Sequence, residues 1–306
     1  MRALVISGGG SKGAFGGGIA EFLIKTQGKK YDLFVGSSVG SLLISQLALG
    51  NISRLKNTFT TVRNRDIYNI FPFSVIKKNG NVTTKINHFN TLRAFIKKAD
   101  TFGESKNLRK LIERTHPRDD YQKLKTAPEV VFTVSNLTKQ RVEYYHAKEC
   151  SYEDYCDWMW ASANYVPFMS LMTKNNFQYA DGGFGSFIPV RYAIEFGATE
   201  IDVIVLDKEL HDDKLDVFSN PFESLMGVFR FMSNQIGFKD MLIAKLKGHQ
   251  SHVDIRLWFA PEDLTDNPLY FNKKQMNEWW KQGYEYAKKT KPKCHCFTPD
   301  GTIIDS

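Results

Sequence analysis

Two glycine-rich segments near the start of the chain contain the residue types needed for acyl transfer. Gly8-Gly9-Gly10-Ser11-Lys12-Gly13 follows one short apolar run, and Gly36-Ser37-Ser38-Val39-Gly40 follows a second. Backbone N–H groups of Gly9 and Gly10 could be presented to an oxyanion. The second segment has the form G-x-S-x-G, which exposes a serine at a tight turn between a strand and a helix. We therefore expect Ser38 to be a nucleophile facing a loop of hydrogen-bond donors.

A base is also needed, because a serine hydroxyl is a weak nucleophile by itself. Asp181, in the downstream segment Asp181-Gly182-Gly183, is the candidate. A carboxylate can act directly on serine if partial desolvation raises its basicity. Lys12 adds positive charge for an oxyanion or an anionic head group. The glycines of the three motifs leave room for close backbone packing and for substrate; they are Gly8, Gly13, Gly36, Gly40, Gly182 and Gly183.

Histidines that follow Asp181 leave a Ser–His–Asp triad open as an alternative. The candidates for its histidine are His211, His249, His252 and His295. An α/β-hydrolase normally has several strands before its nucleophile turn, whereas one clear strand precedes Ser38 here. This order of elements disfavours the triad.

The first glycine loop also fits the nucleotide-binding pattern G-x-G-x-x-G through Gly8, Gly10 and Gly13. That pattern requires an acidic residue about 20 residues further on, and Asp32 is near this position. Asp32 would begin its strand, however, and so would lie at the wrong end of the sheet. A nucleotide site is therefore the weaker interpretation of this loop.

The charge balance of the 306 residues bears on partners. The 41 Lys and Arg exceed the 33 Asp and Glu, for a formal net charge of +8. Such an excess can favour anionic surfaces. No nucleic-acid-binding module is recognisable, so we expect a lipid substrate and peripheral contact with anionic membranes, with no nucleic acid as partner.

Four cysteines are too few for a disulfide framework in a chain of this length. We expect a cytoplasmic, reducing setting, since no apolar segment is long enough to be a membrane span or signal peptide. Cys294-His295-Cys296 could hold a metal but lacks a second ligand pair. The expected chemistry needs neither metal nor organic cofactor.

Alternating strand and helix patterns predict an α/β fold. Strands are expected at residues 2–7, 31–35, 129–135, 141–147, 177–180, 201–206 and 253–259. Helices are expected at residues 14–25, 39–49, 152–163, 218–246 and 273–289. Residues 52–125 are interpreted as helices and loops at one end of the sheet, with turns at Phe71-Pro72-Phe73 and Asn79-Gly80-Asn81. This order predicts a mainly parallel sheet covered on both faces.

The three motifs together resemble those of the patatin-like phospholipase family. That family has a G-G-G-x-[K/R]-G loop, a G-x-S-x-G turn and a D-G-[G/A] segment, and all three are present here in that order. Ala161-Ser162-Ala163 followed by Pro167-Phe168 resembles the segment before the family's aspartate. The resemblance implies a catalytic domain over residues 1–210, with residues 211–306 as a C-terminal extension packed on it.

The resemblance implies a three-layer α/β/α sandwich and a Ser–Asp dyad. Ser38 would attack the acyl carbonyl, and Asp181 would accept its proton and later activate water. Gly9 and Gly10 would bind the oxyanion, and Lys12 stands where the family often has arginine. The implied activity is hydrolysis of carboxylic ester bonds in lipids and phospholipids through an acyl-serine. A Ser–His–Asp esterase of another family and a catalytically silent lipid-binding protein of the same fold remain the alternatives.

Overall fold

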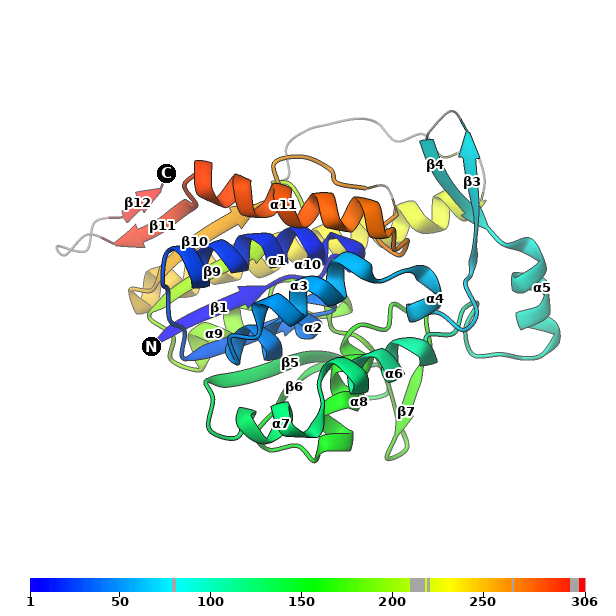
Figure 1. The fold of residues 1–306 in the computed structure, drawn as a ribbon, viewed down its shortest axis with the longest axis horizontal. Helices are drawn as coiled ribbons and strands as arrows, with labels where there is room; N and C mark the ends of the chain where they lie inside the picture. Colours follow the sequence, from blue (N-terminus) through cyan, green and yellow to red (C-terminus); the bar gives the residue numbers. More distant parts are fainter. Residues whose placement is uncertain (79–80, 210–217, 219–220, 266, 298–302, 306) are drawn as a thin grey trace.

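A ten-stranded mixed sheet forms the centre of the computed structural model (Figure 1), which describes residues 1–78, 81–209, 218, 221–265, 267–297 and 303–305. Five neighbouring strands are parallel, in the spatial order β10 (Asp254–Phe259), β9 (Glu200–Val205), β1 (Arg2–Ile6), β2 (Leu33–Ser37) and β5 (Glu129–Asn136). Antiparallel strands continue the sheet on either side of this core; they are β6 (Arg141–His146), β7 (Met172–Lys174), β8 (Phe177–Asp181), β11 (Lys293–Phe297) and β12 (Ile303–Asp305).

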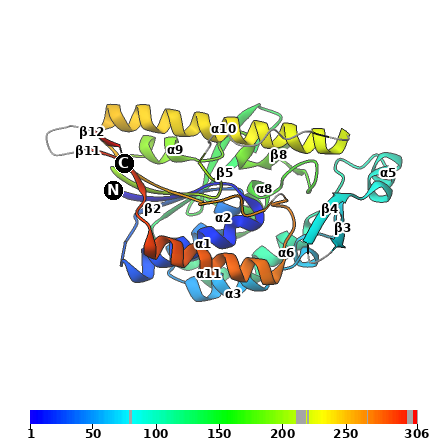
Figure 2. The ribbon, with the colours of Figure 1, turned by 90° about the horizontal axis from the view of Figure 1, so that it is seen from above.

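Both faces of the sheet are covered, because side chains of the central strands alternate between two apolar cores. On β1, Leu4 and Ile6 enter one core, and Ala3 and Val5 enter the other. The first core is shared with α1 (Gly13–Glu21), α2 (Val39–Ala48), α3 (Ile52–Thr61) and α11 (Lys273–Lys289). The second is shared with α9 (Val190–Glu195) and α10 (Pro221–Ser251), on the opposite side in Figure 2. The predicted three-layer sandwich is confirmed.

The shorter helices lie in the segments that connect these strands and long helices. They are η1 (Gly10–Lys12), the π-helix η2 (Phe22–Thr26), α4 (Asn64–Ile67), α5 (His88–Ile96), α6 (Lys106–Thr115), α7 (Arg118–Leu124), α8 (Tyr152–Ser162) and η3 (Gly182–Phe184). Among the later described elements, β10 extends the sheet beside β9, and α11 packs on α1 and α3.

The predicted strands and helices of the central layers are confirmed to within a few residues at their ends. The prediction of helices and loops for residues 52–125 is wrong at one place, where β3 (Phe73–Lys78) and β4 (Asn81–Ile86) form an antiparallel hairpin. Of its expected turn at Asn79-Gly80-Asn81, residues 79–80 lie outside the described residues, and Asn81 begins β4. Strands β7, β11 and β12 were not predicted either. All of these strands pair antiparallel with a neighbour, and such pairing can stabilise short segments without a strong apolar pattern of their own.

Membrane-spanning helices are not found in the described part of the chain, where no helix is both long and apolar enough.

Candidate active site

Ser38 lies at the turn between β2 and α2, in a strained backbone conformation. Its φ of 54° and ψ of −125° are rarely adopted by a residue with a side chain. Close packing fixes this turn, since a Cβ atom on Gly40 would lie 2.3 Å from the carbonyl oxygen of Ile6. The Ser38 N–H donates to the hydroxyl of Ser162 on α8 at 3.0 Å. The hydroxyl of Ser38 is thereby held at the carboxyl end of the parallel sheet.

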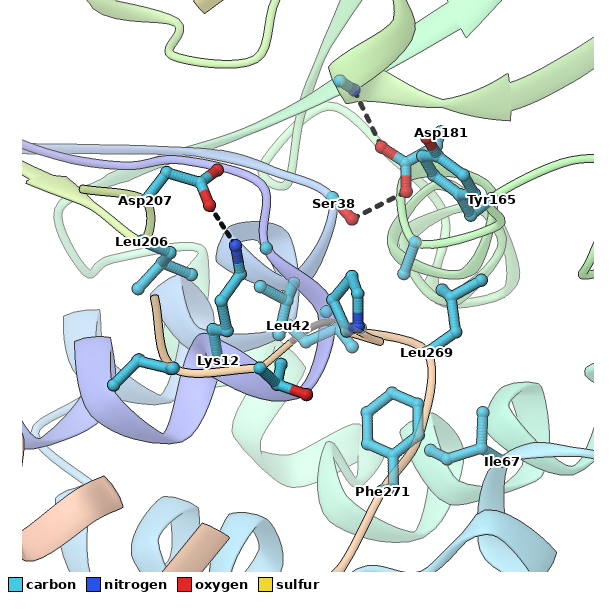
Figure 3. A pocket seen from close by; sticks show the side chains of 18 of the residues that line it. Lys12, Ser38, Leu42, Ile67, Tyr165, Asp181, Leu206, Asp207, Leu269 and Phe271 are labelled. Carbon is cyan, nitrogen blue, oxygen red and sulfur yellow. Dashed lines mark hydrogen bonds and ion pairs between the residues drawn. The ribbon is translucent and has the colours of Figure 1, made fainter. Parts of the chain in front are cut away.

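Asp181 meets the Ser38 hydroxyl directly (Figure 3). Ser38 Oγ donates to Asp181 Oδ2 at 2.6 Å. The other carboxylate oxygen, Oδ1, accepts the backbone N–H of Gly183 at 2.8 Å. Asp181 ends β8, which pairs with β5, so the two motifs 143 residues apart in sequence are brought together by the sheet. No histidine stands between the serine and the carboxylate.

Burial changes the chemistry of this carboxyl group. Asp181 is 2% exposed. Desolvation raises its pKa from the ordinary 3.8 to about 7, although the hydrogen bonds from Ser38 and Gly183 oppose the shift. Asp181 can therefore gain and lose a proton near neutral pH, which an ordinary aspartate cannot do.

The first glycine loop faces the same site with two free donors. Gly8 N–H donates to the carbonyl of Phe187, and Ser11 N–H donates to the carbonyl of Pro268. Between them, the N–H groups of Gly9 and Gly10 have no acceptor among the residues that the structure describes. Such donors at the edge of a cavity can stabilise an oxyanion.

Lys12 lines the same cavity, but its ammonium group is directed to a carboxylate. Its Nζ pairs with Asp207, just beyond the end of β9. In Figure 3 this pair lies on one side of Ser38 and Asp181 lies on the other. Asp207 was not singled out in the sequence, where 195 residues separate it from Lys12.

A cavity of about 730 Å³ contains Ser38 and Asp181 and extends between the helices. Its volume is in the range of sites that hold small organic ligands. Apolar side chains from α2, α3, α6 and the segment before α11 line it; they include Leu42, Leu55, Phe59, Leu108, Ile112, Leu269 and Phe271. Polar side chains also line the cavity, among them Gln46, Thr115 and His116.

The family model described as "Patatin-like phospholipase" matches residues 4–194, which is more than half of the chain. The chain belongs to the patatin-like phospholipase family. A search of curated proteins gives no match. Among solved structures, the crystal structure of VipD from Legionella pneumophila is similar at 13% identity and a TM-score of 0.46, covering 97% of this chain and 68% of that one.

Membership in the patatin-like phospholipase family supports lipid acyl hydrolase activity in general terms. The matched residues include the glycine loop, the Ser38 turn and Asp181, and they end within α9. Strand β9, helix α10 and the Pro268 carbonyl that meets the glycine loop all lie beyond the match.

The histidine and nucleotide alternatives find little support in this geometry. His249, His252 and His295 do not line the cavity, and His211 lies outside the described residues. His116, for which no sequence motif argued, does line it, but burial lowers its pKa to about 4. Asp32 accepts the backbone N–H of Arg2 at 2.8 Å, at the end of β1 opposite to the glycine loop. Within the described ranges, no group of three or more metal-ligating side chains gathers.

Ser162 is expected to position the nucleophile turn. Its hydroxyl accepts the N–H of Ser38 and lies 2.8 Å from the hydroxyl of Ser41. Ser162→Ala leaves that N–H without its acceptor, so we expect about 1–3 kcal/mol lower stability and about tenfold lower kcat with little change in KM. Urea unfolding and steady-state kinetics measure both. Ser53→Ala, at an exposed serine on α3, is the control, and unchanged kinetics in Ser162→Ala would contradict the assignment.

Proposed function

We propose that this protein hydrolyses carboxylic ester bonds of phospholipids through an acyl-serine intermediate, with Ser38 as nucleophile and Asp181 as base. The observation that carries the proposal is the 2.6 Å hydrogen bond from Ser38 Oγ to a buried carboxyl group. Burial places the pKa of Asp181 at about 7, which suits a group that must accept and return a proton within one reaction cycle.

In the acylation step, Ser38 Oγ attacks the ester carbonyl carbon while its proton passes to Asp181. The carbonyl oxygen becomes an oxyanion, for which the N–H groups of Gly9 and Gly10 are the proposed donors. The intermediate then collapses, the ester C–O bond breaks, and the lysolipid oxygen takes the proton back from Asp181. Lys12 contributes by holding the loop through its ion pair with Asp207.

In the deacylation step, water occupies the place of the departed alcohol. Asp181 accepts a proton from this water, and the resulting hydroxide attacks the acyl-serine carbonyl. Collapse of the second intermediate releases the fatty acid and returns the proton from Asp181 to Ser38 Oγ. Every proton is carried by Asp181, so the cycle requires no additional base.

The cavity supports an acyl chain as the recognised part of the substrate. Leu42, Leu55 and Phe59 line it on the side of α2 and α3. Transfer of a chain from water into such a wall contributes about 0.8 kcal/mol for each buried methylene group. This apolar volume beside Ser38 favours a lipid ester over a short polar ester.

Release of fatty acid from phospholipid micelles is the direct test, followed by mass spectrometry without divalent metal. The wild-type rate is expected to rise between pH 6 and pH 8 with a midpoint near 7, because Asp181 acts only when deprotonated. A fluorophosphonate probe should label Ser38 in the same preparation. Absence of both fatty acid release and labelling would exclude the proposed activity and favour the silent lipid-binding alternative.

A further inference from the structure

Helix α5 exposes its apolar face to the surroundings. Four large side chains are largely uncovered: Phe89 (74% exposed), Leu92 (59%), Phe95 (67%) and Ile96 (73%). Their spacing places them on one side of the helix. The less exposed positions of the same helix are taken by Asn90, Thr91 and Ala94. The helix is therefore amphipathic with its apolar side outward, which a water-exposed helix normally avoids.

Charges in the segment that contains this face have one sign. Residues 73–98, which include the β3–β4 hairpin and α5, contain six cationic residues and no Asp or Glu: Lys77, Lys78, Lys85, Arg93, Lys97 and Lys98. Arg93, Lys97 and Lys98 are exposed beside the apolar face. An apolar helix face bordered by Lys and Arg is the combination that lies at the head-group level of an anionic bilayer.

The hairpin and α5 project from the end of the molecule toward which the parallel strands run (Figures 1 and 2). A series of ring contacts connects α5 with the catalytic cavity. The ring centroids of Phe95 and Phe102 are 5.7 Å apart, those of Phe102 and Phe168 are 6.3 Å apart, and those of Phe168 and Phe229 are 5.8 Å apart. Phe229 lines the cavity that contains Ser38. Packed aromatic rings thus connect α5 with the apolar lining of the cavity.

We propose that α5 is a docking helix that inserts Phe89, Leu92 and Ile96 into the surface of an anionic phospholipid bilayer. The choice of a bilayer as partner rests on the proposed function, since the substrate of the adjoining cavity would be a lipid. The cations around the helix contact lipid phosphates, and their charge complements the negative membrane surface. Docking holds the cavity beside the layer from which its substrate must leave.

Vesicle sedimentation with the full chain tests this inference. All proteins carry Ser38→Ala, so that binding is measured without hydrolysis. The test variant carries Phe89→Ser and Ile96→Ser in α5. The control variant carries Phe238→Ser and Leu246→Ser in α10, where these two side chains are also exposed, at 53% and 59%. The α5 pair is expected to lower partition onto phosphatidylcholine–phosphatidylglycerol vesicles about tenfold or more, whereas the α10 pair stays within about twofold. Thermal unfolding verifies that both pairs remain folded.

Charge is tested separately with Arg93→Glu and Lys97→Glu together. This variant should lose at least about tenfold in partition onto anionic vesicles. Its loss of partition onto vesicles of phosphatidylcholine alone should be much smaller. Added salt should weaken the binding of the protein with unchanged Arg93 and Lys97 to anionic vesicles. The proposal is overturned if the α5 variants bind vesicles as well as the protein with unchanged α5 does. It is also overturned if the α10 pair lowers vesicle partition as much as the α5 pair does. A change in self-association by light scattering with vesicle binding unchanged also overturns it, in favour of an interface between copies. Fatty acid release is measured apart, so failure of hydrolysis with intact α5-dependent binding rejects only the proposed activity.

Discussion

Ser38→Ala and Asp181→Asn are each expected to lower phospholipid hydrolysis by about 10³-fold or more. Ser38→Ala removes the attacking oxygen. Asp181→Asn keeps the shape of the side chain and can still accept the N–H of Gly183, but an amide cannot accept the serine proton. Because the two residues act in the same proton transfer, the double variant should be little worse than either single one. Mass spectrometry of released fatty acid measures all three.

Asp240 provides a matched control for Asp181. It is a second mostly buried carboxyl whose pKa burial raises to about 7, and it accepts the N–H of Ile188 at 2.8 Å. It is not among the residues that line the cavity. Asp240→Asn should therefore retain most of the activity. Activity that survives in Asp181→Asn would assign the base to another residue and revive a histidine-based mechanism.

The same Asp181→Asn substitution is expected to stabilise the folded protein at alkaline pH. A carboxyl whose pKa is about 7 when folded, against 3.8 ordinarily, holds its proton more tightly in the folded state between these pH values. The free energy of unfolding therefore falls as pH rises through this window, by on the order of 4 kcal/mol. Asparagine does not ionise, so the variant should gain about 2 kcal/mol or more at pH 8.

Urea unfolding at pH 5 and pH 8 measures this effect. At pH 5 the wild-type carboxyl is protonated in the folded state but already mostly ionised in the unfolded state, so about 1.5 kcal/mol of this fall has occurred and the variant should gain less than at pH 8. At pH 8 the variant should unfold at higher urea concentration. An equal difference at both pH values would contradict the raised pKa of Asp181. Higher stability together with lost activity would show that the buried Asp181 carboxylate lowers the free energy of unfolding while the reaction requires it.

Local sequence was sufficient to predict the main parts of the candidate site. G-x-S-x-G and D-G-G prescribe tight turns after strands, and turn geometry depends on residues within the motif itself. Buried apolar runs such as residues 201–206 predicted the central strands, because a parallel sheet covered on both faces requires continuous apolar side chains. The meeting of Ser38 with Asp181 then follows from the sheet, in which β8 lies beside β5.

Contacts between distant segments could not be predicted in this way. The pairing of Lys12 with Asp207 and the acceptance of the Ser38 N–H by Ser162 depend on three-dimensional packing of ordinary residues. Strands β3 and β4 were missed because residues 73–86 have a weak alternation of apolar and polar side chains, and their pairing with each other stabilises them. Because residues 52–125 were interpreted only as helices and loops, the outward apolar face of α5 was not recognised from the sequence.

The position of β1 in the sheet has a consequence for how the protein is made. Arg2 pairs with Glu200, 198 residues later in the chain, so one neighbour of the first strand is synthesised roughly 10–40 s after it. Until then the ribosome-bound chain carries the nucleophile turn without a completed sheet. The Pro268 carbonyl that meets the glycine loop arrives later still. On the proposed function, hydrolysis should therefore begin only after synthesis has passed these residues.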